Sequence, residues 1–486
     1  MKPSLKKNYL YRVLYEILIL ITPFITTPYV SRVLGADGIG IYSYTHSIVS
    51  YFMLFGALGT MGYGTREIAR NRDDKRKASK LFWEIELMTV ATTGCCLIIW
   101  IVVIFTSKQY SYYYLALTPF LLSTMFDISW FFTGYEMIKS IVIRNSLVRI
   151  MGIILLFLLV KQKQDVMIYC IINSGVSLLG NLSMWMYIPR MIEKVNFREL
   201  QFKHHFQETL VYFIPTIATS IYTVLDKTLI GLITENEFQN GYYEQATKVI
   251  NIIKSLVFVA VNSVMGARLS YLFAEEKYEE IHRRIDRSMN FIYLLGYGCA
   301  FGVVAVAQRF VPMFFGKGFE PVVPLLYVMA PLIIIIGTSN CLGTHYYTPS
   351  GQRKRSAKVI VLGAVINLCL NLLMIPRFGV YGAAIASVIA ECVITIFYVQ
   401  MSGGYMSWQY IGRVSIKRVI SGSVMVFVVW IIGNHIILSD LKTVILQVII
   451  GGIIYLGLLL FMKDTMLIEL LGMGKHLITK IQKSTR

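Results

Sequence analysis

The fold is decided by two neighbouring apolar stretches, residues 209–233 (TLVYFIPTIATSIYTVLDKTLIGLI) and 242–270 (YYEQATKVINIIKSLVFVAVNSVMGARLS). Each is longer than the ~20 apolar residues that a helix needs to cross a bilayer. Each also carries charged residues inside the apolar run, namely Asp226 and Lys227 in the first, and Lys248 and Lys254 in the second. Because a charge in lipid is costly, such residues usually line a water-filled path or a substrate site.

The composition argues against a soluble protein. Of the 486 residues, 56% are hydrophobic and only 15% are charged, which is too apolar for a soluble chain of this length. The net charge of +19 comes from basic residues between the apolar runs, so we expect anionic membrane lipids as partners and no nucleic acid. The cysteines lie in apolar segments without metal-ligand spacing. Neither they nor the adjacent His204 and His205, in a basic loop, are expected to bind a metal.

The remaining apolar runs predict further membrane helices. In all we expect about fourteen spans, at residues 9–31, 39–61, 83–105, 112–134, 142–160, 166–189, 209–233, 242–270, 289–311, 322–347, 359–376, 380–400, 419–437 and 443–462. No A-x-A cleavage site follows the first run, so this run is predicted to be a membrane helix that is kept, and not a signal peptide.

Loop charge predicts the orientation. Lys and Arg are concentrated in every second connection, for example 66–80, 190–203 and 353–358, and they are sparse in the connections between. Because basic loops stay on the cytoplasmic side, both termini are predicted to be cytoplasmic.

An internal repeat is visible around the spans that open each half of the chain. Residues 34–35 (LG) end the first span and 40–42 (GIY) open the second, while 230–231 (IG) end the seventh and 241–243 (GYY) open the eighth. A repeat after six spans gives both halves the same orientation, so the two six-helix repeats are predicted to be parallel. Chance is the alternative explanation, because Gly and Tyr are common at membrane interfaces.

The fold class that follows is an all-α polytopic membrane protein with two parallel six-helix lobes. The predicted lobes are residues 1–190 and 205–400. Residues 415–465 add two transmembrane helices outside the repeat, and 466–486 form a cytoplasmic tail.

The chain shows no catalytic constellation. It has no Walker loop, no GxSxG and no HExxH, so we expect neither an enzyme nor a cofactor. The informative residues are polar side chains inside the spans, and the substrate-binding candidates are Lys254, Lys248, Asn251, Asp226, Lys227, Arg32 and Asn262. Those on the eighth helix fall in or beside one narrow sector at ~100° per residue, as expected of a face that lines a cavity. The alternative is pairing within the bundle, such as Asp226 with Lys248.

Two further groups are candidates for coupling and gating. The carboxylates that could exchange an ion are Glu391, Glu16 and Asp226, and the gating candidates are Asp127, Trp130, Glu136, Pro23, Pro28 and Pro215. Prolines break backbone hydrogen bonds and permit kinks, although membrane helices also tolerate them without a mechanical role. Asp127 and Glu136 flank Trp130 near a predicted cytoplasmic end, where they serve either a gate or an anchor.

Five motifs, in order along nearly the whole chain, resemble a known family. They are PYVSRVLGADGIGIYSY (28–44), DISWFFTGYEMIKSIVIRN (127–145), LDKTLIG (225–231), GYYEQATKV (241–249) and INLCLNLLMIPRFGVYGAAIASVIAE (366–391). They look like the bacterial polysaccharide-repeat flippases, which belong to the multidrug/oligosaccharidyl-lipid/polysaccharide exporter superfamily.

The resemblance implies a V-shaped bundle of two lobes around a central cavity, which is lined chiefly by spans one, two, seven and eight. It implies alternating-access transport of undecaprenyl-pyrophosphate-linked oligosaccharide from the inner to the outer leaflet of the bacterial plasma membrane, for capsule, O-antigen or a related polysaccharide. A polysaccharide polymerase is a further implied partner. A cationic cavity suits a pyrophosphate cargo.

Two other functions remain as alternatives. A cation-coupled multidrug exporter of the same superfamily should have an acidic, apolar cavity, and the lysines of the eighth span argue against it. A membrane polymerase or ligase should carry catalytic residues in a sizeable outer loop, whereas the predicted outer loops, such as 234–241, are short.

Overall fold

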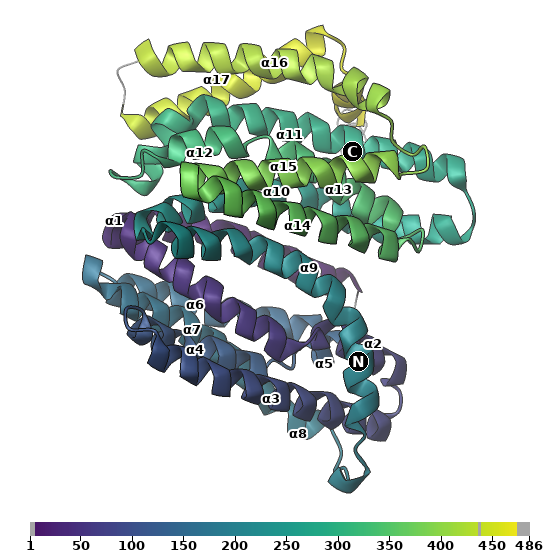
Figure 1. Ribbon diagram of the computed structural model, residues 1–486. Helices are drawn as coiled ribbons and strands as arrows, with labels where there is room; N and C mark the ends of the chain where they lie inside the picture. The colour runs from purple at the N-terminus through teal and green to yellow at the C-terminus, as the bar shows by residue number, and fades with distance from the viewer. Residues whose placement is uncertain (1–4, 436–438, 474–486) are drawn as a thin grey trace, which may run out of the picture. The chain divides into compact units, whose positions relative to one another are not determined.

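The computed structural model describes residues 5–435 and 439–473, and every regular element in these ranges is helical (Figure 1). In chain order the elements are α1 (Leu5–Ala57), α2 (Thr60–Asn71), α3 (Lys75–Thr106), α4 (Ser111–Met125), α5 (Ser129–Gly134), α6 (Ile138–Leu159), η1 (Lys163–Asp165), α7 (Val166–Met184), η2 (Trp185–Tyr187), α8 (Ile188–Met191), η3 (Phe197–Glu199), α9 (Phe202–Thr234), α10 (Glu237–Ala274), α11 (Tyr278–Phe315), α12 (Val322–Met329), α13 (Leu332–Leu342), η4 (Gly343–Tyr347), α14 (Arg353–Phe378), α15 (Val380–Gln400), α16 (Trp408–His435) and α17 (Asp440–Phe461), followed by a helical segment at 465–473.

The helices match the predicted membrane spans. Among the described residues, eleven helical segments are long and apolar enough to cross a membrane, and one of them, Ile17–Asn71, covers the first two predicted spans. The seventh and eighth predicted spans correspond to α9 and α10, which are 33 and 38 residues long. The prediction of an all-α polytopic membrane protein is confirmed.

The first two spans are joined by a kink. Gly35 has φ 70° and ψ 177° inside α1, where an L side chain would be strained, and the chain resumes as a helix at once. The connection between the first two predicted spans, 9–31 and 39–61, is therefore reduced to a single non-helical residue. The backbone around Pro23 and Pro28 stays helical, so the break in α1 lies at the glycine and not at either proline.

The chain packs as two compact units, Met1–Gly241 and Tyr242–Arg486, and each is described by itself. In the first unit α9 packs against α1, α2 and α3. In the second unit α16 and α17 lie side by side against α11, and α14 pairs with α15 (Figure 1). The predicted lobes, 1–190 and 205–400, and the cavity between them stay a prediction.

Within the first unit, α1 and the first turn of α10 cross at backbone contact. A Cβ atom at Gly40 would lie 1.7 Å from the carbonyl oxygen of Glu237, and one at Gly241 would lie 1.9 Å from that of Ala36. Gly40 follows Ala36 by four residues, as Gly241 follows Glu237, so the two contacts are reciprocal. Glycine is therefore required at both positions, and the predicted internal repeat stays a prediction.

Side chains hold the same crossing together. The Glu237 carboxylate accepts hydrogen bonds from Gln109 Nε2 at 3.1 Å and from Tyr110 OH at 3.0 Å. Burial, followed by this bond to Glu237, raises the pKa of Tyr110 above its ordinary value. Tyr110 therefore remains a hydrogen-bond donor to Glu237 at neutral pH.

The second unit contains a buried ion pair between α16 and the turn after α17. Arg418 is 1% exposed and donates to Asp464 through Nε at 3.2 Å and through one terminal nitrogen, Nη2, at 3.3 Å. Asp464 also accepts from the backbone N–H groups of Met466 and Leu467 at 3.1 Å, which fixes the start of the segment at 465–473. Part of the predicted tail at 466–486 is thus a packed helix. Residues 474–486 of that prediction lie outside the described residues.

Replacing Asp464 by leucine is expected to lower the free energy of unfolding by about 3–5 kcal/mol, because it leaves the buried Arg418 charge without its partner. Chemical unfolding of the purified protein in detergent measures the change. Arg413, exposed on the same helix, provides the control variant Arg413→Met, which should unfold like the parent. An Asp464→Leu protein as stable as this control would mean that the pair contributes nothing.

Candidate functional site

The lysines predicted to bind substrate lie on α10 and have carboxylate partners in the second unit. Lys248 Nζ is 3.6 Å from Glu244 Oε1, one turn earlier on the same helix. Lys254 interacts electrostatically with Glu391, a buried residue of α15. The helices thus bring together a predicted substrate residue and a predicted ion-coupling residue that lie 137 positions apart in the sequence.

Polar side chains continue this arrangement onto the neighbouring helices. Tyr243 OH lies 3.3 Å from Ser387 Oγ, which also accepts from Asn367 Nδ2 at 3.4 Å, and Asn371 Nδ2 donates to Asn367 Oδ1 at 3.0 Å. All four residues are buried, and they join α10, α14 and α15. These contacts form a fixed polar layer, which holds α10 in one rotational position. The same helix carries Lys248 and Lys254, which we call the lysine row of α10.

The other substrate candidates on α10 are placed less completely. Asn251 is exposed, and its backbone carbonyl oxygen accepts a hydrogen bond from Ser255 Oγ at 2.9 Å. Asn262 lies two turns beyond Lys254 on the same helix, and its side chain is outside the described residues.

The first unit holds three of the predicted residues. Asp226 is buried and Lys227 is half-buried on α9, while Arg32 is exposed on α1. Close to Asp226, Thr228 Oγ1 lies 2.9 Å from Ser47 Oγ and 3.3 Å from Tyr51 OH, and these contacts fasten α9 to α1.

Two predictions lie outside the described side chains. Glu16, an ion-coupling candidate on α1, and Pro215, a gating candidate on α9, occupy helical positions in the chain. Of the remaining prolines, Pro23 lines a pocket of the first unit.

The gating candidates around Trp130 have identifiable structural contacts. Asp127 Oδ1 accepts from the backbone N–H of Ser129 at 3.0 Å at the start of α5. Trp130 is 1% exposed and stacks on Phe82 with ring centroids 5.8 Å apart. Glu136 is exposed and pairs with Arg72 at 2.9 Å. These contacts favour the anchoring alternative, and a gating role stays a prediction.

Sequence reasoning missed a buried hydrogen-bond network at the start of α9. His205 Nδ1 lies 2.7 Å from Tyr63 OH, and its Nε2 lies 2.9 Å from Glu84 Oε2. The other oxygen of Glu84 accepts from the backbone N–H of Gln201 at 2.7 Å. His205 lies in helix α9, so its assignment to a loop was wrong. Its partners come from α2 and α3, more than a hundred residues away, which no local pattern reveals.

Two charged residues inside membrane helices were also missed. Glu86 of α3 is 1% exposed, and within the described part of the chain neither carboxylate oxygen has a hydrogen-bond partner. Arg149 of α6 lies inside the span Ile141–Leu159. Both residues lie within predicted spans, together with a second charged residue of the same sign, Glu84 for Glu86 and Arg144 for Arg149.

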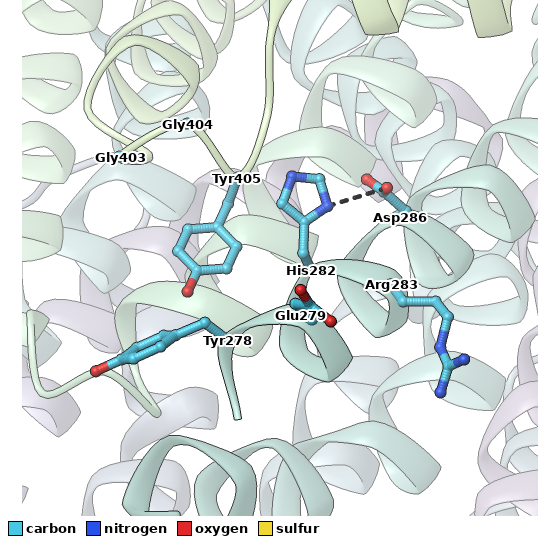
Figure 2. A pocket seen from close by; sticks show the side chains of 8 residues that line it. All are labelled: Tyr278, Glu279, His282, Arg283, Asp286, Gly403, Gly404 and Tyr405. Carbon is cyan, nitrogen blue, oxygen red and sulfur yellow. Dashed lines mark hydrogen bonds and ion pairs between the residues drawn. The ribbon is translucent and has the colours of Figure 1, made fainter. Parts of the chain in front are cut away.

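A separate pocket of about 630 Å³ opens where α11 begins, beside the turn before α16 (Figure 2). His282 Nδ1 lies 3.1 Å from Asp286 Oδ2, and the His282 ring stacks on Tyr405 at 5.7 Å (Figure 2). Arg283 extends away from this pair in the same view. The pocket lies at a predicted cytoplasmic connection, and it contains none of the residues predicted for transport.

Comparison with known proteins identifies the family. Residues 5–266, more than half of the chain, match the family model described as "Polysaccharide biosynthesis protein". The chain belongs to this family. The family resemblance that the five motifs predicted is thereby confirmed.

Two proteins with similar sequences are named as a transporter and a flippase. The "Putative O-antigen transporter" of Escherichia coli (strain K12) is 23% identical over 399 residues, covering 81% of this chain and 95% of that protein. The "Probable low-salt glycan biosynthesis flippase Agl15" of Haloferax volcanii is 25% identical over 321 residues, covering 64% of each chain.

Solved structures show the fold. The structure titled "Lipid II flippase MurJ, inward closed conformation" matches with a TM-score of 0.72 at 15% identity, covering 93% of this chain and 99% of that one. An inward-facing multidrug resistance MATE family transporter of the MOP superfamily matches with a TM-score of 0.58 at 13% identity, covering 86% of this chain and 98% of that one. The fold is therefore shared with both flippases and drug transporters.

Proposed function

We propose that this protein is a flippase that moves a lipid-linked oligosaccharide from the inner to the outer leaflet of a bacterial plasma membrane. Membership of the polysaccharide biosynthesis family supports this proposal, as do relatives named for O-antigen transport and for glycan flipping. The observation that carries the mechanism is the electrostatic interaction between Lys254 and the buried Glu391 inside a membrane helix bundle.

This electrostatic interaction provides a way to bind and release an anion. A lysine deep in the membrane is costly unless water, a carboxylate or an anionic ligand meets it. Glu391 compensates Lys254 when no cargo is present, and the pyrophosphate of the cargo replaces the carboxylate when it arrives. Charge-assisted hydrogen bonds from Lys248 and Lys254 then hold the pyrophosphate, and Asn251 lies between them.

The cargo we propose is an undecaprenyl-pyrophosphate-linked repeat unit for capsule, O-antigen or a related polymer. Sugars would contact the amide and aromatic groups near the lysine row, such as Asn251 and Tyr243. Both termini are proposed to be cytoplasmic, and a polysaccharide polymerase is proposed to receive the product. Glu391, Glu16 and Asp226 remain the candidates for ion coupling.

The multidrug exporter is the alternative, since a MATE transporter shares the fold. The lysine row of α10 disfavours it, because cationic drugs would be repelled there.

Deleting the gene separates the two functions. We expect lipid-linked repeat units to accumulate on the inner leaflet and surface polymer to disappear, with both restored by the intact gene. Polymer would be measured on whole cells, and the lipid-linked intermediates would be measured in membrane extracts. Normal polymer together with altered drug resistance would contradict the flippase and favour the exporter.

A further inference from the structure

A pocket of about 470 Å³ lies inside the first unit, between α1, α4, α6 and α7. It is separate from the α10 lysine row, which belongs to the second unit. We call it the Arg149 pocket, and the residues that line it and bear on its chemistry are Asn145, Arg149, Ile153, Leu156, Ser177 and Asn181. Its volume falls within the ~300–1,000 Å³ typical of small-molecule sites.

Arg149 is the unusual member of this pocket. It lies eight residues beyond the start of the span Ile141–Leu159, which corresponds to a depth of ~12 Å at ~1.5 Å per residue. Within the described part of the chain, Arg149 makes no hydrogen bond or ion pair. Arg144, one and a half turns earlier on the same helix, interacts with Asp127 and donates to Asn145. The N–H groups of the Arg149 guanidinium are therefore available to a ligand that enters the pocket.

Amide and hydroxyl groups gather beside this guanidinium. Asn145 precedes Arg149 by one turn on α6, and Ser177 and Asn181 face the pocket from α7. Asn181 Nδ2 donates to the backbone oxygen of Ser123 at 2.8 Å, which leaves its second N–H and its carbonyl oxygen for a ligand. Ser177 Oγ lies 3.0 Å from Ser123 Oγ. This end of the pocket is therefore fixed, polar and cationic.

The wall beyond the guanidinium is apolar. Ile153 and Leu156 continue along α6, and Ile172 and Val176 face them from α7. Gly152 permits the two helices to approach closely, since a Cβ atom there would lie 3.2 Å from Val176 Cγ2. The pocket therefore presents a cation and, roughly 10 Å further along α6 at ~1.5 Å per residue, hydrocarbon.

We propose that the Arg149 pocket binds the phosphate group of a lipid, with the Arg149 guanidinium as counter-ion and the apolar wall against the first part of the lipid chain. A guanidinium binds phosphate oxygens with two parallel hydrogen bonds, which the amide and hydroxyl groups that line the pocket can supplement. An isoprenoid phosphate and a glycerophospholipid share this chemistry. The proposal does not depend on the proposed transport cycle.

Binding to the purified full-length protein tests the proposal, in a detergent that contains no phosphate. A Lys254→Ala background removes the lysine proposed to bind pyrophosphate elsewhere. The probes are farnesyl pyrophosphate, dioleoylphosphatidylglycerol and inorganic pyrophosphate, and bound probe is measured by native mass spectrometry. We expect Arg149→Gln to weaken binding of a lipid probe by about tenfold or more, and Arg149→Lys to restore part of it.

Two further variants keep the test sharp. Ile153→Trp fills the apolar wall and leaves the guanidinium in place, so it should also weaken binding of the lipid probe. Arg377→Gln removes one exposed arginine from the second unit and should bind like its parent. A preference for farnesyl pyrophosphate identifies an isoprenoid phosphate as the occupant, and a preference for dioleoylphosphatidylglycerol identifies a membrane lipid.

Two results would overturn the proposal. One is an Arg149→Gln protein that binds both lipid probes like its parent. The other is inorganic pyrophosphate binding as tightly as the lipids, because the apolar wall would then contribute nothing.

Discussion

Replacing Lys254 by alanine is expected to abolish export of surface polymer while the protein still inserts and folds. Lys254 lies about twelve residues into the predicted span 242–270, which at ~1.5 Å per residue is ~18 Å deep in a ~30 Å hydrocarbon core. A lysine at that depth cannot extend its ammonium group to either surface. Its removal takes away the cation proposed to bind the pyrophosphate. Surface polymer, measured at matched protein abundance in the membrane, provides the readout.

Graded variants separate binding from structure. Lys254→Arg should retain part of the activity, because charge matters more than shape at this position. Lys248→Ala should be milder, since Lys248 lies nearer the membrane surface. Full export by Lys254→Ala would reduce Lys254 to an ion-pair partner of Glu391, and the cargo site would then have to be sought elsewhere, with Arg32 the next candidate.

Replacing Gly40 or Gly241 by valine is expected to prevent the protein from reaching its folded state. A Cβ atom at either position would lie within 2 Å of a backbone carbonyl oxygen, at 1.7 Å and 1.9 Å respectively. Because both partners are backbone atoms, no side-chain rotation can relieve the clash, and α1 would have to separate from the first turn of α10. Protein abundance in the membrane and thermal unfolding in detergent would show the loss.

The chain offers matched controls for this experiment. Gly94 and Gly175 lie in the membrane helices α3 and α7, and no atom would come within 4 Å of an added Cβ there. Valine at these positions should leave abundance close to that of the parent protein. A Gly40→Val protein with the parent's abundance and melting temperature would show that the helices do not meet as described.

Long apolar runs made the helices predictable, because backbone groups in lipid must be satisfied within a helix. The helix boundaries were less predictable. The polar residues 237–241 (EFQNG) were assigned to an outer loop, yet they form the first turn of α10, where Glu237 is held by Gln109 and Tyr110. Contacts from a distant element decided that boundary, and no local pattern contains them.

The candidate site was predictable only in part. Intramembrane lysines and carboxylates can be read from their position in apolar runs, and this identified Lys254 and Glu391. The proximity of Lys254 to Glu391 could not be predicted from the sequence, because it depends on how α10 packs against α15. Arg149 was overlooked at a span with uncertain ends, where an arginine resembles a residue of the cytoplasmic border. Its importance emerges only from the pocket that it lines.

The central claim is that the protein moves a lipid-linked oligosaccharide across a bilayer, and transport in proteoliposomes tests it most directly. Purified protein would be reconstituted with an undecaprenyl-pyrophosphate-linked oligosaccharide whose sugars bind a membrane-impermeant lectin. With the intact protein, lipid from the inner leaflet should become accessible to the lectin much faster than in protein-free vesicles, and Lys254→Ala should match the protein-free rate. Folded, reconstituted protein that leaves the rate at the protein-free level would contradict the account.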